Sequence, residues 1–263
     1  MQRYHDRVAR RYDASYEDVF WRFHDVLTWE YLKPYLPSDQ TIPVMDLGCG
    51  TGKWALKLLK SGYRVVCVDI SGAMVERARV KITEAGQADR AEFYRADLCD
   101  LSALPRGRCH PFAVAMGDVV GCAASPPRAL KEVRKRLGEE GIFVATVDNK
   151  LAALNFYLES GSAEQFGAFL KTGRTHWLTK DRTERFEIHT YTPKEAVRLF
   201  ERAGFEVLEV RGKTVLDFRH HRGLLAEGAD RRAWMKIEKN LSKDPDALSR
   251  AGHLQIAARV KRG

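Results

Sequence analysis

The chain has 263 residues, 44% of them hydrophobic and 30% charged, and its formal net charge is +9 at neutral pH. This length suits one α/β domain that carries a small cap, and this composition excludes a disordered chain. No apolar run reaches the roughly eighteen residues that a membrane-spanning helix needs, so a membrane protein is excluded as well.

Residues 1–40 look helical and are unusually aromatic, with Tyr12 and Tyr16 among them. The segment mixes charged and aromatic residues and lacks the apolar core of an export signal, so we expect a cytoplasmic protein. Aromatic helices that lie outside the main pattern of the chain indicate a cap that covers a ligand site. We therefore assign residues 1–40 to an N-terminal helical cap.

Between residues 41 and 149, short β-rich runs alternate with helical stretches. This alternation predicts an α/β fold, with a mostly parallel sheet and helices on both faces. We expect Gly62 and Gly138 to end two of the helices, because glycine tolerates the left-handed conformation, and Ser71 to cap a third. The expected strands are 44–47, 64–68, 91–95, 112–116 and 142–147, and the two helices ended by glycine are 53–61 and 128–137.

Residues 150–190 interrupt the alternation, and we interpret this insert as a second part of the cap. The pattern resumes over 191–263. The segment 192–195 has a capping-box sequence with proline at the first helical position, so a helix should run to Ala203 and end at Gly204. Two more strands, at 205–210 and 254–260, complete a doubly wound sheet within a single domain.

The five cysteines and the positive charge have ordinary explanations. No C-x-x-C pair is present, which argues against a disulfide framework or a zinc site. The lysines and arginines are scattered in small groups such as 131–136, where nearby glutamates indicate a solvated helix face. Nucleic acid is therefore an open alternative as a partner, but the charge alone does not favour it.

The strongest local signal is the glycine-rich turn DLGCGTG at 46–52, between the first strand and its helix. Glycines let the backbone turn tightly and approach a ligand, and the helix N-terminus adds unpaired N–H groups, so a nucleotide-like ligand is implied. Asp46 precedes the turn, and Asp69 and Asp97 end the next two strands. Three acids would repel a phosphate, whereas they suit a ligand that has a cationic group and a ribose.

The segments 44–52, 66–71 with Met74, and 96–98 resemble the class I S-adenosylmethionine-dependent methyltransferase family. The resemblance implies a seven-stranded sheet in the order 3-2-1-4-5-7-6 with the last strand antiparallel, and S-adenosylmethionine as the cofactor. The implied cofactor residues are Asp46, Gly48, Cys49, Gly50 and Gly52 for the methionine part, Asp69 for the ribose, Ile70 and Met74 for the adenine faces, Asp97 and Leu98 for the adenine edge, and Met116 and Gly117 beside the methyl group.

Methyl transfer from a sulfonium is a direct displacement with an activated leaving group, so positioning supplies much of the acceleration. A base is needed only if the acceptor arrives protonated. The candidate catalytic residues are His176, His189, Asp118 and Tyr12.

A metal is a further alternative. Asp118, Asp148 and Asn149 resemble the positions at which catechol-type O-methyltransferases hold a divalent cation, and oxygen ligands of this kind suit Mg²⁺. The long insert after Asn149 argues against this similarity, and Asp-Asn is a common turn pair, so we expect no metal.

Three functions are open on the sequence. The leading hypothesis is methyl transfer to an N or O atom of a small molecule, enclosed by the two cap segments. The second is an RNA methyltransferase, although residues 117–120 lack the Asn/Asp-Pro-Pro-aromatic motif of the amino-directed enzymes. The third is a non-catalytic nucleotide-binding regulator, including a dehydrogenase-like binder, against which the G-x-G-x-G spacing argues.

Overall fold

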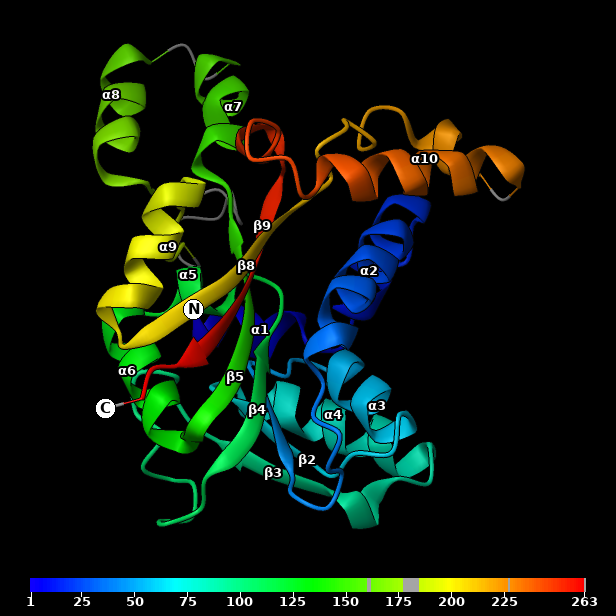
Figure 1. Cartoon of the computed structure of the whole chain (residues 1–263), viewed down its shortest axis with the longest axis vertical. Coiled ribbons are helices and arrows are strands. Elements are labelled where there is room, and N and C mark those ends of the chain that lie inside the picture. Colours follow the sequence, from blue (N-terminus) through cyan, green and yellow to red (C-terminus); the bar gives the residue numbers. More distant parts are fainter. Residues whose placement is uncertain (160–161, 177–184, 227, 263) are drawn as a thin grey trace.

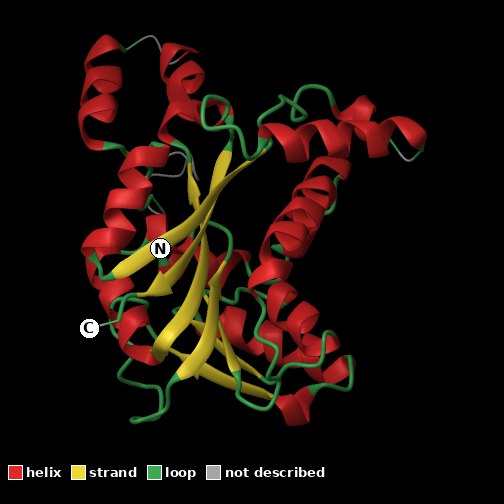
Figure 2. Cartoon of the chain, viewed as in Figure 1, coloured by secondary structure: helices red, strands yellow, loops and turns green. Residues whose placement is uncertain are grey.

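The computed structural model describes residues 1–159, 162–176, 185–226 and 228–262. Its centre is a seven-stranded sheet in the order β3-β2-β1-β4-β5-β9-β8 (Figures 1 and 2). A separate two-stranded sheet joins β6 and β7. With that small hairpin left out of the numbering, this is the predicted order 3-2-1-4-5-7-6. β9 pairs antiparallel with both β5 and β8, so the predicted fold class is confirmed.

The central strands are buried along their whole length. Every residue of β1 and β2 is inaccessible, as expected for strands that are covered by helices on both faces. The strands of the large sheet are β1 Val44–Leu47, β2 Val65–Asp69, β3 Ala91–Arg95, β4 His110–Ala115, β5 Leu137–Asp148, β8 Phe205–Lys213 and β9 His253–Val260.

Helices pack on both faces of this sheet and form two apolar cores. Side chains of α3 (Lys53–Lys60) and α4 (Gly72–Glu84) pack on one face, together with Leu32 at the end of α2 (Val19–Leu32). On the other face, α6 (Pro126–Arg136) and α9 (Pro193–Arg202) cover the same strands, beside the short α5 (Val119–Cys122). Two covered faces make the sheet doubly wound.

The capping box before α9 is confirmed. The backbone N–H of Glu195 donates to Thr192 Oγ1 over 3.2 Å, and the backbone N–H of Thr192 donates to Glu195 Oε2 over 2.9 Å. The predicted helix end at Gly138 is wrong. α6 stops at Arg136 and β5 begins at Leu137, because Leu137 already pairs with His110 of β4.

The remaining elements extend beyond the sheet. Figure 1 shows α7 and α8 past one end of the strands and α10 across the end of α2. Among the described residues, no helix combines the length and the apolar character needed to cross a bilayer. The further elements are α1 Gln2–Val8, α7 Leu154–Glu159, α8 Ala163–Thr172, β6 Arg174–Thr175, β7 Ile188–His189 and α10 Ala229–Leu241, with 3-10 helices η1 Asp13–Tyr16, η2 Lys33–Tyr35, η3 Ala88–Arg90, η4 Lys150–Ala153, η5 Arg222–Leu225 and η6 Leu248–Arg250.

Candidate active site

The glycine-rich loop lies at the carboxyl end of β1, where open α/β sheets bind ligands. Gly48 has φ +68°, and a Cβ atom there would lie 2.4 Å from a methyl group of Val119. Gly50 has φ +53°, and a Cβ atom there would meet nothing within 4 Å. Gly48 is therefore required for packing against α5, whereas Gly50 faces open space and leaves the backbone bare for a ligand.

Asp46 is a buried carboxylate without a counterpart. Its side chain is 1% exposed, and neither oxygen accepts a hydrogen bond of normal geometry in the described chain. Burial raises the pKa of Asp46 to about 7, against a smaller opposing effect of the Ala55 backbone N–H. A buried acid needs a partner, and a cationic group such as the amino group of S-adenosylmethionine would supply one. This orphaned carboxylate fits the implied cofactor.

Asp69 organises the loop from the end of β2. Its Oδ2 accepts the backbone N–H of Gly50 over 2.9 Å, and its Oδ1 accepts that of Ser71 over 2.8 Å. Burial raises the pKa of Asp69, while these two N–H groups oppose the increase. One carboxylate thus joins the glycine loop to the start of α4, at the position from which the resemblance expects a ribose to be held.

Several of the other predicted cofactor residues lie in the apolar interior of the protein. Met74 is fully buried and packs with Val8 and Ala9 of the N-terminal segment. Cys49 and Leu98 belong to the two apolar cores that flank the sheet. These contacts with the core are ordinary packing, and a role toward the cofactor stays a prediction for each of them.

The rest of the predicted cofactor residues lie at strand ends beside the loop. Ile70 is part-exposed directly after Asp69. Asp97 Oδ1 accepts the backbone N–H of Cys99 over 2.8 Å, in a turn after β3. Met116 is 6% exposed after β4, and the Gly117 N–H donates to Thr146 Oγ1 of β5 over 2.8 Å. Gly52 has φ +83° and caps the start of α3.

The N-terminal segment covers this loop and is held by two carboxylates. Asp6 Oδ1 accepts the hydroxyl of Ser71 at the start of α4. Asp13 Oδ1 accepts the hydroxyl of Thr51 in the glycine loop, and its Oδ2 pairs with Lys81 Nζ over 2.6 Å. Nothing in the local sequence of residues 1–18 indicates these partners, because all of them come from segments far along the chain.

Removing both carboxylates, as Asp6→Ala/Asp13→Ala, is expected to speed tryptic cleavage within residues 1–18 about fivefold. A part-exposed ion pair and the hydroxyl hydrogen bonds together contribute about 1 kcal/mol to closure of the segment. Limited proteolysis followed by mass spectrometry measures this rate. Asp39→Ala is the control, since Asp39 accepts hydrogen bonds from Thr41 in its own loop. Equal cleavage of the double variant and the wild type would show that the two acids do not hold the segment.

Asp118 is placed beside a second acid. It adopts φ 60° before α5, and its Oδ1 accepts the backbone N–H of Asp148 over 3.3 Å, while its Oδ2 has no partner in the described chain. Burial, and then the negative charge of Asp148, raise the pKa of Asp118 well above its usual value. Asp118 therefore binds a proton more readily than an exposed aspartate does, and it lies beside a second acid.

The other candidate bases differ in their surroundings. Tyr12 lies against Tyr16, with ring centroids 4.9 Å apart, and burial raises the pKa of Tyr12 well above its usual value. His189 lies on β7, half-buried, with Nε2 at 3.4 Å from Glu187, and burial lowers its pKa. His176 is exposed, next to the undescribed residues 177–184. The structure therefore brings Tyr12 toward the loop and leaves His176 in solvent.

The hydrogen bonds of Asn149 do not support the alternative of a metal site. Its amide donates to the carbonyls of Leu248, Ser249 and Ala251, and its oxygen accepts the N–H of Leu151. The side chain is therefore fully used in joining β5 to the segment before β9. Within the described ranges, no three His, Cys, Asp or Glu side chains are arranged to hold a metal ion.

A row of ionisable side chains next to Asp148 was not predicted from the sequence. Asp148 of β5 lies directly opposite His253 of β9, which lies opposite Lys213 of β8. Directly opposed residues share a face of the sheet, and this face packs against α2. There Lys213 Nζ donates a hydrogen bond to Thr28 Oγ1 over 3.0 Å. Burial lowers the pKa of Lys213 to about 7 and that of His253 to about 3.

The row is invisible in the sequence because its members come from three separate strands. His253 Nε2 is 3.5 Å from Asp148 Oδ1, and its Nδ1 has no hydrogen-bond partner among the residues that the structure describes. The His24 ring of α2 packs edge-on against it, with centroids 4.9 Å apart. Only the register of an antiparallel sheet, which single-sequence patterns do not give, brings these residues together.

Comparison with known proteins identifies the domain that contains this loop. Residues 44–141 match the family model of a methyltransferase domain. A putative S-adenosylmethionine-dependent methyltransferase from Listeria monocytogenes has a similar fold, with a TM-score of 0.62 at 18% identity over 89% of this chain and 96% of that one. Residues 44–141 are therefore similar in sequence to a methyltransferase domain, and the chain shares its fold with solved S-adenosylmethionine-dependent methyltransferases. The resemblance seen in the glycine loop is confirmed by this match.

Relatives of the methyltransferase domain differ in how much of their length they share with this chain. The uncharacterized protein MJ1252 of Methanocaldococcus jannaschii is 28% identical over 82% of this chain and 80% of its own. The tRNA 5-carboxymethoxyuridine methyltransferase of Escherichia coli K12 is 21% identical over 80% and 77%. The 23S rRNA (uracil(1939)-C(5))-methyltransferase RlmD of Shewanella halifaxensis is 46% identical, but the match spans 29% of this chain and 16% of that protein.

Proposed function

We propose that the protein transfers a methyl group from S-adenosylmethionine to an N or O atom of a small molecule. When bound, the cofactor supplies a methyl group on a positively charged sulfur, which needs no further activation. The protein then has to bind that cofactor, hold the acceptor in line with the methyl group and, for a protonated acceptor, take up a proton. Asp46, Asp69 and the glycine loop perform the first task in this proposal.

The observation that carries the acceptor site is an aromatic wall next to the paired acids. Ring centroids follow one another from Tyr12 to Tyr16 at 4.9 Å, from Tyr16 to Trp21 at 4.9 Å and from Trp21 to His253 at 6.2 Å. His253 is the neighbour of Asp148 across the sheet. A flat acceptor would pack against these rings while its nucleophilic atom faces Asp118 and Asp148.

The two acids are suited to accept the acceptor's proton. The pKa of Asp118 is raised by burial and by the charge of Asp148, so this pair has a higher affinity for a proton than exposed carboxylates have. A carboxylate of this pair takes the proton from a hydroxyl as its oxygen attacks the methyl carbon, or takes a proton from an ammonium group beforehand so that the free amine can attack. Asp118 and Asp148 are therefore our candidates for the base, with Tyr12 as a neutral hydrogen-bonding group.

Ligand binding tests the cofactor part of this proposal. S-adenosylmethionine and S-adenosylhomocysteine are each expected to raise the melting temperature, because a ligand that binds the native state stabilises it. NAD is the control for a dehydrogenase-like binder. Stabilisation by NAD with no effect of the two sulfur nucleosides would reject methyl transfer and favour the third hypothesis.

The acceptor part needs a separate experiment. Radiolabelled methyl groups from S-adenosylmethionine are followed into the dialysable small molecules, the RNA and the protein of a cell extract. We expect label in the small molecules. Label in RNA would instead support an RNA methyltransferase. This stays the second candidate because the Escherichia coli and Shewanella relatives are named as RNA methyltransferases and because the surface carries a basic groove.

A further inference from the structure

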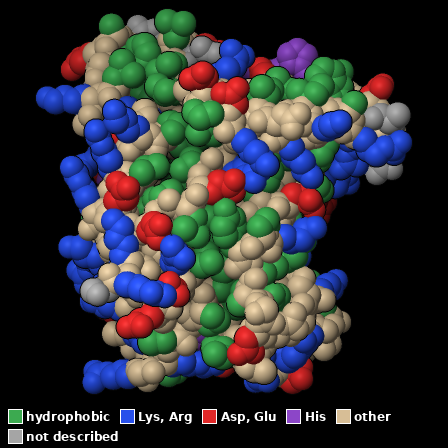
Figure 3. Space-filling model, in the orientation of Figure 1, with side chains coloured by type: hydrophobic (Ala, Val, Ile, Leu, Met, Phe, Trp, Pro, Cys, Tyr) green, Lys and Arg blue, Asp and Glu red, His purple; other side chains and the backbone are tan. Residues whose placement is uncertain are grey.

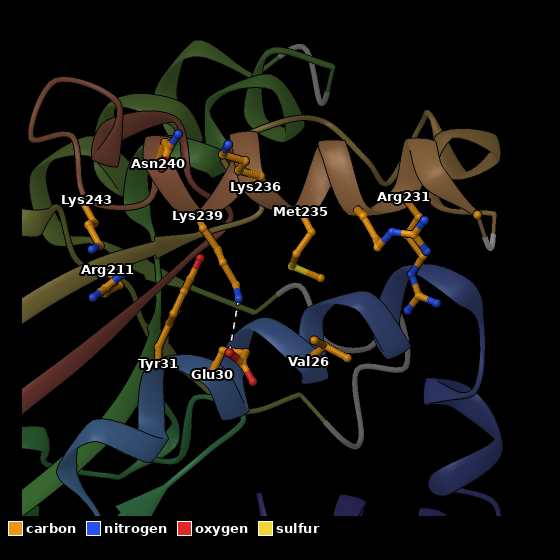
Figure 4. Close-up of a pocket in the computed structure, with 12 residues that line it drawn as sticks. Val26, Glu30, Tyr31, Arg211, Arg231, Met235, Lys236, Lys239, Asn240 and Lys243 are labelled. Carbon is orange, nitrogen blue, oxygen red and sulfur yellow. Dashed lines mark hydrogen bonds and ion pairs between the residues drawn. The ribbon is translucent and has the colours of Figure 1, made fainter.

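A second hollow lies between α2 and α10, apart from the residues assigned to methyl transfer (Figure 4). Its volume is about 840 Å³, within the usual range for ligand sites. We call it the α2–α10 groove. Figure 3 shows Lys and Arg side chains gathered along this edge of the molecule. The cationic residues that line the groove are Arg211, Arg231, Arg232, Lys236, Lys239 and Lys243.

The positive charge of the groove is far from balanced. Glu30 is the acid among the residues that line it, and it already pairs with Lys239 over 3.2 Å and with Lys33 over 2.7 Å. Figure 4 shows the Lys239 side chain reaching down from α10 to this carboxylate. Arg211 pairs with Glu209 over 2.8 Å. Among the residues that line the groove the cations outnumber the acids, and Arg232, Lys236 and Lys243 add positive charge to that of Arg211 and Lys239, which attracts an anionic ligand.

The cations on α10 are spaced for an extended ligand. Arg232, Lys236 and Lys239 are separated by four and three residues, and Lys243 follows four residues later, just beyond the helix end. At 1.5 Å of rise per residue, the stretch from 232 to 243 spans about 16 Å along one side. A single phosphate is too small to contact all four side chains. A strand with repeated phosphates contacts them in sequence.

A buried tyrosine lies beneath the groove. Tyr31 is 4% exposed, and its hydroxyl, which points toward α10 in Figure 4, lies by Ser242 and is closed off from solvent. Burial raises the pKa of Tyr31 to about 12, so the group stays protonated. Tyr31 therefore supports the wall of the groove, and the cations around it are the groups that a ligand would contact.

We propose that the α2–α10 groove binds the phosphodiester backbone of a nucleic acid strand. Half of its cations are arginines, whose planar guanidinium groups can bind two phosphate oxygens at once, and the row of cations along α10 suits a polymer that carries negative charges at regular intervals. The proposal adds a partner to the proposed function and does not depend on the identity of the acceptor, since binding is measured without methyl transfer.

Fluorescence anisotropy with a fluorescein-labelled single-stranded RNA of about 20 nucleotides tests the groove. The variant Lys236→Gln/Lys243→Gln removes two exposed charges that are not part of the methyl-transfer site. We expect its Kd for RNA to rise about tenfold, and the slope of log Kd against log salt to fall by about 1.4, because two phosphate contacts are lost.

The matched control is Lys131→Gln/Lys135→Gln on α6, which loses the same charge from two exposed lysines on the other face of the sheet. It should bind RNA as the wild type does. Equal weakening by both double variants, no RNA binding by the wild type, or tighter binding of polyglutamate than of RNA would overturn the proposal. All variants should keep the stabilisation by S-adenosylmethionine. If the wild type lacks that stabilisation, the proposed function fails while the RNA result still decides the groove.

Discussion

Replacing Asp69 with alanine is expected to weaken S-adenosylmethionine binding about 100-fold, measured by isothermal titration calorimetry. The carboxylate at the end of β2 holds the N–H groups of Gly50 and Ser71, and in the implied complex it also accepts the ribose hydroxyls. A hydrogen bond to a charged group contributes about 1.5–3 kcal/mol, so the loss of two such bonds explains an effect of this size.

Asp69→Asn separates binding from folding, because the amide keeps the shape of the side chain and retains one acceptor oxygen. It should be as soluble as the wild type and bind the cofactor with intermediate affinity. The control is Asp89→Ala, at an exposed acid in η3. Wild-type affinity in Asp69→Ala would mean that the carboxylate only shapes the loop, and the assignment of the ribose position would be wrong.

Asp46→Asn is expected to weaken the cofactor about 100-fold and, in the cofactor-free protein, to raise stability. In the described part of the chain, the charged form of Asp46 is buried without a cationic partner, so removing that charge stabilises the folded protein. The negative charge of Asp46 also attracts the cationic groups of the cofactor, so the variant that lacks this charge binds the cofactor poorly. Calorimetry gives the affinity, and urea unfolding near pH 8 should show an increase of about 1–3 kcal/mol in the free energy of unfolding.

The pH dependence of stability and of cofactor affinity distinguishes an effect of the Asp46 charge from a general disruption of the fold. Its folded pKa of about 7 lies above the ordinary 3.8, so the folded state holds a proton that the unfolded chain has released. Stability of the cofactor-free wild type should therefore fall as pH rises from about 4 to 7, then level off. Cofactor affinity should rise about tenfold per unit over the upper part of that range. Both trends should disappear in Asp46→Asn, and a variant that keeps them would refute this role for Asp46.

The glycine loop shows what local sequence can predict. The turn and the strand before it depend on residues within about ten positions of one another, because glycine tolerates positive φ and the apolar residues of Val44–Leu47 suit a buried strand. The start of α9 is equally local, since Thr192 and Glu195 form a capping box. The expected strand order followed from the resemblance rather than from these preferences.

Gly138 shows where local preference failed. A glycine after a helical run is a common helix end, yet the chain enters β5 one residue earlier because Leu137 pairs with His110. The same limit applied to Asn149, whose position after β5 suggested a metal ligand. Its amide instead bonds to three carbonyls about a hundred residues away, which no local pattern reveals.

The sequence by itself determined the glycine loop and the doubly wound sheet, because these depend on short segments with strong backbone preferences, and its motifs carried the resemblance to methyltransferases. The tertiary structure alone decided which side chains lie beside Asp118 and which line the α2–α10 groove. Asp148, His253 and Lys213 meet only through strand register, Asp13 reaches Thr51 only after the N-terminal segment docks, and the α2–α10 groove exists only where two distant helices cross. Long-range packing sets these contacts, and residue spacing along the chain does not encode them.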